Sequence, residues 1–120
     1  MSAVRLKRVY EPRAPEDGLR VLVDRLWPRG LRREDAGVDV WLKEVAPSAE
    51  LRRWYGHDLE RWPAFCRRYE AELAENPALD EIRSLQRAHE TITLLFAKRD
   101  TEHNNAVVLQ RLLSGEASAA

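Results

Sequence analysis

Residues 21–30 have the sequence Val21-Leu22-Val23-Asp24-Arg25-Leu26-Trp27-Pro28-Arg29-Gly30, which changes from apolar to polar after three positions. A short apolar core of this kind, rich in β-branched residues, is typical of a strand buried on both faces in the middle of an α/β sheet. Pro28 and Gly30 interrupt a regular strand, so the strand is predicted to end before them.

Other segments on both sides of this one are also predicted to be strands. The clearest is Thr91–Ala97, a run of β-branched and apolar residues. Weaker alternation predicts a first strand at Leu6–Tyr10 and another at Val38–Leu42. The segment Glu11–Gly18 contains two prolines and an Asp-Gly pair, and it is predicted to be a loop.

Turn and cap residues predict where the first two helices begin and end. Ser48 is a good N-cap residue and Gly56 a good helix terminator, so one helix is expected between them. The next helix is expected to begin at about Pro63, because proline is well tolerated in the first turn. Asp58 lies too far upstream to cap that helix, and a short separate turn is expected after it.

Two more helices are predicted in the second half of the chain. Pro77 interrupts the chain, and the third helix carries apolar residues at helical spacing from Leu79 to Ala88. The fourth follows the last strand, with Asp100 or Thr101 as its expected N-cap.

The chain has the size and composition of one globular domain. It has 120 residues, of which 44% are hydrophobic and 33% charged, so it has enough apolar side chains to form a core. We expect a single compact α/β domain over residues 1–113. Its small, mostly parallel sheet of three to four strands would be flanked by about four helices. Residues 114–120 are small and polar, and they are expected to form a frayed tail.

Charge and hydropathy narrow the classes of partner. Twenty Lys and Arg residues balance twenty Asp and Glu residues, giving a formal net charge of zero. A dedicated nucleic-acid-binding protein usually carries a basic excess, so this balance weighs against that class. No apolar run approaches the roughly 20 residues that span a bilayer, and Met1–Tyr10 lacks the apolar segment of a signal peptide. A cytoplasmic protein without a membrane partner is therefore expected.

The residue types that most often bind metals or act as nucleophiles show no recognisable pattern. His57, His89 and His103 do not have metal-ligand spacing, so no metal site is predicted. Cys66 lies on an apolar helical face and is expected in the core. The sequence contains neither a glycine-rich phosphate loop nor a nucleophile elbow. These patterns identify no cofactor and no enzyme class.

Two charged segments follow predicted strands, at Asp24–Gly30 and Lys98–Asn105. Ligands of open α/β sheets bind outside the carboxyl ends of the strands, where such segments lead into helices. Free N–H groups at a helix N-terminus add partial positive charge there. The side chains expected around one crevice are Arg25, Arg29, Arg99, His103 and Asn104. The pattern predicts an anion site.

Each of these residues also has a purely structural interpretation. Asp24 and Arg25 would then form an ion pair across the end of the strand. Arg29 would be a solvated turn residue, and His103 and Asn104 would satisfy backbone groups in the first turn of the last helix. The sequence leaves both interpretations open.

The chain closely resembles the YeaO-like family, a bacterial family that carries a domain of unknown function. The residues that carry the resemblance are Val21–Gly30, Trp41–Ser48, Leu51-Arg52, Thr93–Leu95 running on to Asn104, and Ala106–Leu109. The resemblance covers about Val4 to Leu113 and implies a compact α/β domain. It supplies no established substrate or catalytic residues. The family signature contains more polar residues than packing needs, which suggests a shared ligand. These residues are Asp24, Arg25, Arg29, Lys43, Ser48 and Asn104.

The leading hypothesis is a small anionic ligand, phosphate-like or nucleotide-like. The candidate ligand-binding residues are Arg25, Arg29, Lys43, Arg99 and Asn104. If the protein is an enzyme, Arg29 and Arg99 would bind the anion bidentately, Asp24 or His103 would transfer protons, and Asn104 would orient the substrate.

Two hypotheses from other classes remain. One is a nucleic-acid-binding module that uses paired arginines and exposed tryptophans, although interleaved Glu and Asp residues cancel much of the positive charge. The other is a protein-interaction or regulatory domain without a small ligand, with an aromatic patch near Trp54 and Tyr55.

Overall fold

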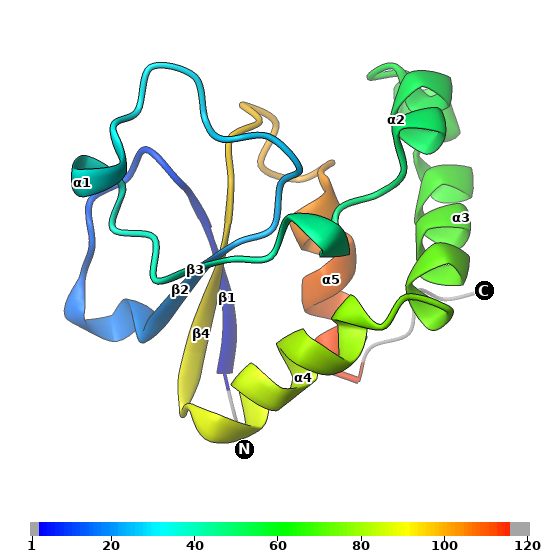
Figure 1. Cartoon of the computed structure of the whole chain (residues 1–120). Coiled ribbons are helices and arrows are strands. Elements are labelled where there is room, and N and C mark those ends of the chain that lie inside the picture. The colour runs from blue at the N-terminus through cyan, green and yellow to red at the C-terminus, as the bar shows by residue number, and fades with distance from the viewer. Residues whose placement is uncertain (1–2, 116–120) are drawn as a thin grey trace.

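The computed structural model describes residues 3–115, which form a four-stranded, entirely parallel sheet in the order β1-β4-β2-β3 (Figure 1). The strands are β1 (Ala3–Arg8), β2 (Leu19–Leu22), β3 (Val40–Trp41) and β4 (Thr91–Phe96). The predicted α/β class is therefore confirmed, with four strands and no antiparallel pair among the described residues. The first strand lies earlier in the chain than predicted, whereas β4 lies where its apolar run placed it.

Five helices accompany the sheet within residues 3–115, and four of them lie on the same side of it (Figure 1). The helices are α1 (Arg33–Ala36), α2 (Ala49–Tyr55), α3 (Trp62–Ala74), α4 (Ala78–Ala88) and α5 (Asn105–Leu113). Helices α4 and α5 contact the strands, α3 packs on α5, and α2 packs on α3. The single turn α1 lies on the opposite side (Figure 1). None of the helices in the described part of the chain is long and apolar enough to cross a membrane.

The cap predictions for α2 and α3 are confirmed. The Ser48 hydroxyl accepts a hydrogen bond from the Leu51 N–H at 3.1 Å, and Gly56 ends α2 in the left-handed conformation with φ 51°. Asp58 caps a short 3₁₀ turn, Leu59–Arg61, as expected. Pro63 then lies in the first turn of α3, where its missing N–H costs no helical hydrogen bond.

The predicted N-cap of the last helix is wrong. The cap is Asn104, whose side-chain oxygen accepts the Val107 N–H at 3.1 Å. Asp100 instead closes a turn of its own, because its carboxylate accepts the N–H groups of Glu102 and His103. His103 therefore lies in the loop before α5, and Asn104 immediately precedes the helix.

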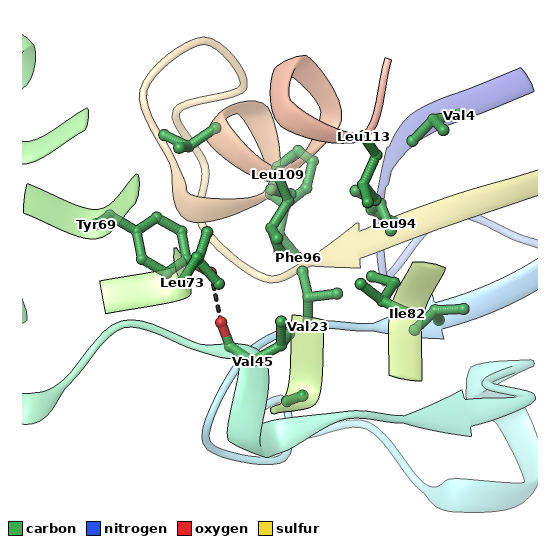
Figure 2. Close-up of a cluster of buried hydrophobic side chains, with 14 of the residues drawn as sticks. Val4, Val23, Val45, Tyr69, Leu73, Ile82, Leu94, Phe96, Leu109 and Leu113 are labelled. Carbon is green, nitrogen blue, oxygen red and sulfur yellow. Dashed lines mark hydrogen bonds between the residues drawn. The ribbon is translucent and has the colours of Figure 1, made fainter. Parts of the chain in front are cut away.

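The two faces of the sheet are both buried, but they differ in chemistry. The helix-covered face holds the main apolar core, in which Leu94 and Phe96 of β4 meet Leu109 of α5 (Figure 2). Cys66 lies in this core, as predicted. The opposite face has a small apolar cluster around Leu22. The rest of that face carries a buried polar cluster.

The C-terminal tail was predicted to fray from residue 114. Ser114 and Gly115 form the turn that follows α5, with the Ser114 N–H bonded to the Gln110 carbonyl oxygen at 2.9 Å. Residues 116–120 lie outside the described residues.

Candidate functional site

A cavity of about 490 Å³ lies at the carboxyl ends of β2 and β4. Most of its lining comes from three segments far apart in the sequence, 24–29, 46–57 and 97–105. This edge of an open parallel sheet is where ligands of α/β proteins usually bind, and the volume is within the range of small-molecule sites. We refer to this cavity as the strand-end pocket.

Four cationic side chains line the strand-end pocket: Arg25, Arg29, Arg52 and Lys98. Arg25 has a carboxylate near it, with its Nη1 atom 3.6 Å from Glu44 Oε2. Arg29 and Arg52 are exposed, and within residues 3–115 neither guanidinium group forms an ion pair. The Arg29 backbone is held in place, because its carbonyl oxygen accepts the Tyr10 hydroxyl at 3.0 Å.

Lys98, like Arg25, is half-buried, whereas Arg29 and Arg52 are exposed. The Lys98 Nζ atom donates to the His103 carbonyl oxygen at 2.8 Å and lies 4.9 Å from the centre of the Tyr55 ring. Burial lowers the pKa of Lys98, while the nearby charge of Asp100 opposes that change. The side chain therefore braces the loop before α5 as well as lining the pocket.

Asp24 is a half-buried carboxylate among these cations. Its Oδ2 atom accepts the Ala97 N–H at 2.9 Å, which ties the end of β2 to the end of β4. Burial raises the pKa of the Asp24 carboxyl, against hydrogen bonds from Ala97 and Asn105 and the charge of Arg52. The ion pair considered between Asp24 and Arg25 does not form, because Arg25 approaches Glu44 instead.

Two asparagines at the start of α5 line the pocket and also hold its wall together. Asn104 is only 3% exposed, and besides capping α5 it donates to the Asp100 carbonyl oxygen at 2.9 Å. Asn105 donates to the Val23 carbonyl oxygen at 2.9 Å, which connects α5 to the end of β2. Asn104 therefore combines the structural role considered for it with a place at the pocket.

The structure brings together only part of the predicted site. Asp24, Arg25, Arg29 and Asn104 line the strand-end pocket, whereas Lys43, Arg99 and His103 do not. Lys43 lies over the ring of Trp41, with its Nζ atom 5.5 Å from the ring centre. Arg99 borders a separate shallow depression. The His103 Nδ1 atom lies 3.0 Å from Asp100 Oδ2, and the ring makes an edge contact with Trp62.

The sequence interpretation missed several pocket residues. Arg52 lies on a helix surface, where an arginine carries no local indication of a site, although it belongs to the residues that resemble the family. Lys98 lies in the charged segment after β4, and its place in that segment is the sequence feature that could have indicated a pocket residue. Tyr55 is 5% exposed and its ring packs on Phe65 at 4.8 Å. Among the described residues its hydroxyl has no hydrogen-bond partner.

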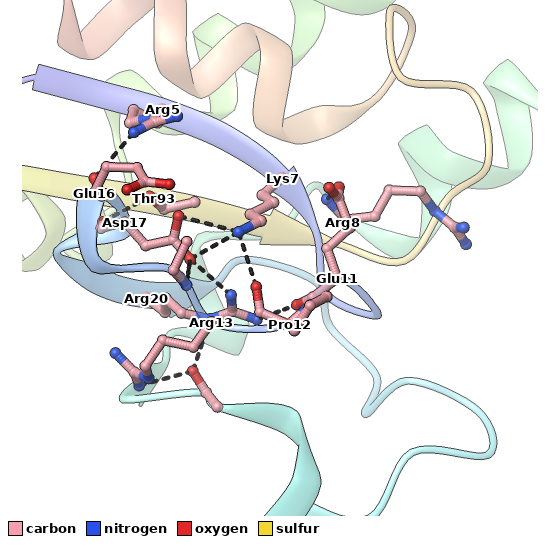
Figure 3. Close-up of polar contacts among 12 residues, drawn as sticks. Arg5, Lys7, Arg8, Glu11, Pro12, Arg13, Glu16, Asp17, Arg20 and Thr93 are labelled. Carbon is pink, nitrogen blue, oxygen red and sulfur yellow. Dashed lines mark hydrogen bonds and ion pairs between the residues drawn. The ribbon is translucent and has the colours of Figure 1, made fainter.

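A second polar constellation lies buried on the opposite face of the sheet, at its centre (Figure 3). Arg20, which is fully buried, donates to Asp17 Oδ2 at 2.9 Å and to the carbonyl oxygens of Glu11, Ala36 and Gly37. Because all these donors end on protein acceptors, this arginine has a structural role.

Asp17 completes that constellation. It accepts from Lys7 Nζ at 3.0 Å, and its backbone carbonyl accepts the Thr93 hydroxyl at 2.7 Å (Figure 3). Burial opposes ionisation, but hydrogen bonds from the Ala14 N–H, Lys7 and Arg20 outweigh it and lower the pKa of Asp17 to about 2. We refer to Lys7, Asp17 and Arg20 as the buried ion cluster.

The described residues do not offer a metal site. Between residues 3 and 115 no three His, Cys, Asp or Glu side chains group closely enough to hold an ion. The strand-end pocket is lined by three arginines, a lysine, one carboxylate, two asparagines, the His57 imidazole and several aromatic rings.

Comparison with known proteins identifies the family. A family model described as the inactive DUF488-N3 subclade matches residues 3–120. Uncharacterised proteins of Mycobacterium tuberculosis and Mycobacterium bovis are each 48% identical over 112 residues, which is 93% of this chain and 94% of theirs. The protein YeaO of Escherichia coli is 39% identical over 106 residues, covering 88% of this chain and 92% of its own. No solved structure matches the chain. The chain therefore belongs to the YeaO-like DUF488 family.

Proposed function

We propose that this protein binds a small organic anion, phosphate-like or nucleotide-like, in the strand-end pocket. The observation that carries the proposal is the balance of charge there, with Arg25, Arg29, Arg52 and Lys98 facing a single carboxylate, Asp24. Within residues 3–115 neither Arg29 nor Arg52 forms an ion pair, although the charge of Arg52 acts on Asp24, so both guanidinium groups can donate to an anion. Guanidinium groups suit phosphate and carboxylate because they donate two parallel hydrogen bonds.

The proposal is for a binding protein rather than a catalyst. The matching subclade is described as inactive. Of the two residues predicted for proton transfer, Asp24 lines the pocket and His103 does not, although a different histidine, His57, lines it as well. General acid–base catalysis requires each group within hydrogen-bond reach of the reacting atoms.

Nucleic-acid binding receives less support from the surface. Stacking on single strands requires exposed aromatic faces. Trp54 is covered by Arg61 and Arg68, whose guanidinium carbons lie 5.2 and 4.0 Å from its ring. Trp27 packs edge-on against Trp41 at 5.5 Å. An oligonucleotide is therefore expected to bind more weakly than a mononucleotide.

The test is calorimetric titration of the protein with inorganic phosphate, ribose 5-phosphate and nucleoside monophosphates. We expect at least one phosphorylated compound to bind, and Arg29→Ala and Arg52→Ala each to weaken binding about tenfold or more, as the loss of a charge-assisted hydrogen bond does. Arg53→Ala is the matched control, because Arg53 is exposed on the same helix as Arg52 but does not line the pocket. Equal losses in the Arg52 and Arg53 variants, or no binding at all, would contradict the proposal.

A further inference from the structure

The binding of an anion does not account for the carboxylate of Asp24 in the strand-end pocket. Buried or half-buried charges are usually paired, yet within residues 3–115 Asp24 belongs to none of the ion pairs. Its hydrogen bonds from Ala97 and Asn105 leave acceptor positions free, because a carboxylate can accept about four. A negative group of this kind repels an anion but attracts an N–H donor.

A second polar group in the same pocket also lacks a partner. The Tyr55 hydroxyl is buried and forms no hydrogen bond among the described residues, although Tyr55 itself lines the cavity. An unsatisfied buried hydroxyl destabilises a fold, so folds retain one chiefly where another molecule completes its hydrogen bonding. Tyr55 lies in α2 and Asp24 follows β2, so two independent elements contribute such a group.

The remaining walls suit a flat ring. Tyr10, Trp27, Tyr55 and Phe65 line the pocket, and Leu26 at its border is 71% exposed. Of these rings Tyr10 is the most exposed, at 41%, and an exposed aromatic face can stack on a planar heterocycle, while Trp27, Tyr55 and Phe65 supply apolar wall. The exposed Arg29 and Arg52 carry the positive charge on the solvent side, whereas Asp24 and Tyr55 are the more enclosed groups.

From these contacts we infer that the ligand is dipolar, with a planar N–H-bearing ring that enters first and an anionic group that stays at the mouth. Asp24 accepts from the ring N–H groups, as carboxylates accept from the amino groups of nucleobases. Tyr55 donates to a ring acceptor, and Arg29 and Arg52 hold the anion. A purine nucleoside monophosphate has this arrangement, and guanine offers adjacent N–H donors beside a carbonyl acceptor. The inference rests on the proposed function, because it assigns the two ends of the same ligand.

The wild-type protein alone provides the first test, by titration with GMP, IMP, ribose 5-phosphate and guanosine. GMP is expected to bind at least about tenfold more tightly than ribose 5-phosphate, which keeps the anion but lacks the ring. IMP lacks only the exocyclic amino group and is expected to lie between the two. Guanosine, without the phosphate, is expected to bind more weakly than GMP.

Two variants then assign the recognition to residues. Asp24→Asn is expected to weaken GMP binding about tenfold and to leave ribose 5-phosphate binding unchanged or tighter, because a negative charge is removed. Tyr55→Phe is expected to weaken GMP binding several-fold without loss of stability, because the deleted hydroxyl has no hydrogen-bond partner among the described residues. Arg53→Ala again serves as the control, and thermal unfolding of each variant verifies that it is folded.

The outcomes separate the two proposals. Equal affinities for GMP and ribose 5-phosphate would overturn the dipolar ligand and leave the anion-binding function in place. Unchanged GMP binding in both folded variants would overturn the roles of Asp24 and Tyr55. If none of the phosphorylated compounds binds, the proposed function fails and this inference fails with it. If Asp24→Asn does not fold, the ligand series and Tyr55→Phe still decide the question.

Discussion

Asp17 and Asp24 are carboxylates placed in opposite electrostatic environments. Asp17 is paired with Lys7 and Arg20 in the buried ion cluster, and its pKa is lowered to about 2. Asp24 forms no ion pair within residues 3–115, and burial raises its pKa. By linkage the ionised form of Asp17 stabilises the fold at neutral pH, whereas the ionised form of Asp24 is a cost. A charged side chain that destabilises the fold but lies at a pocket is typical of a residue retained for binding.

The buried ion cluster predicts a defined pH dependence of stability. The folded pKa of Asp17 is below its ordinary value of 3.8, so its contribution is complete at neutral pH. The contribution declines as the pH falls below about 5 and is lost below about 2. A pKa lowered by this amount corresponds to about 2 kcal/mol. We expect Asp17→Asn to lower the free energy of unfolding by at least that much at pH 7. The difference in unfolding free energy between the wild type and Asp17→Asn is expected to become smaller in acid.

The measurement is urea unfolding of both proteins between pH 7 and pH 2. Asp35→Asn is the control, because Asp35 is exposed in α1 and belongs to no ion pair within residues 3–115. If the difference in unfolding free energy between the wild type and Asp17→Asn stays constant with pH, ionisation of Asp17 does not stabilise the fold.

At the scale of single elements, α5 depends on its N-cap. Asn104 both accepts the Val107 N–H and donates to the Asp100 carbonyl oxygen, so it joins the helix to the loop that lines the pocket. Replacing a good cap by alanine costs about 1 kcal/mol, and the lost second bond adds to that. Asn104→Ala is therefore expected to lower the free energy of unfolding by about 1–2 kcal/mol. Asn104→Ser keeps a capping oxygen and is expected to lose less.

Chemical denaturation of the two variants tests this role. If Asn104→Ser is as unstable as Asn104→Ala, the lost stability does not come from the cap. If Asn104→Ala is as stable as the wild type, α5 does not need the cap at all.

The elements that the sequence predicted well are those set by local chemistry. Ser48 and Gly56 delimit α2 through contacts within a few residues, and the apolar run of β4 is nearly continuous. The start of α5 was missed because Asp100, Thr101 and Asn104 are all cap-forming residues. The choice among them depends on contacts across the loop, including Lys98 donating to the His103 carbonyl oxygen.

The sequence carries no comparable signal for which side chains from distant segments come together in the folded protein. Arg20 lies in an apolar strand, and only the packing of the 11–18 loop and α1 against that face supplies its acceptors. Arg52 reaches the pocket because α2 packs where it does, which helical periodicity alone does not reveal. Arg25 and Arg29 were found because they follow a strand directly, and the carboxyl ends of parallel strands share one edge.

At the scale of the whole molecule, the strand-end pocket joins segments that are otherwise far apart in the chain. Hydrogen bonds between Asp24 and the Ala97 N–H and between Asn105 and the Val23 carbonyl oxygen already connect two of them. The third, residues 46–57, reaches the pocket through α2, which packs on α3 rather than on the sheet. A ligand held by Arg29 and Arg52 would bridge the sheet side of the pocket to this outer helix layer.

Ligand binding is accordingly expected to slow amide hydrogen exchange in all three segments, 24–29, 46–57 and 97–105. The physical reason is that bridging contacts reduce the local opening through which amides exchange. Helix α4 contacts β4 but does not line the pocket, so its exchange should change least and provides an internal control. Exchange with and without a bound nucleoside monophosphate, followed by mass spectrometry of peptides, makes the comparison. Slowing confined to 24–29 would place the ligand on the strand exit alone, and the pocket would not act as one unit.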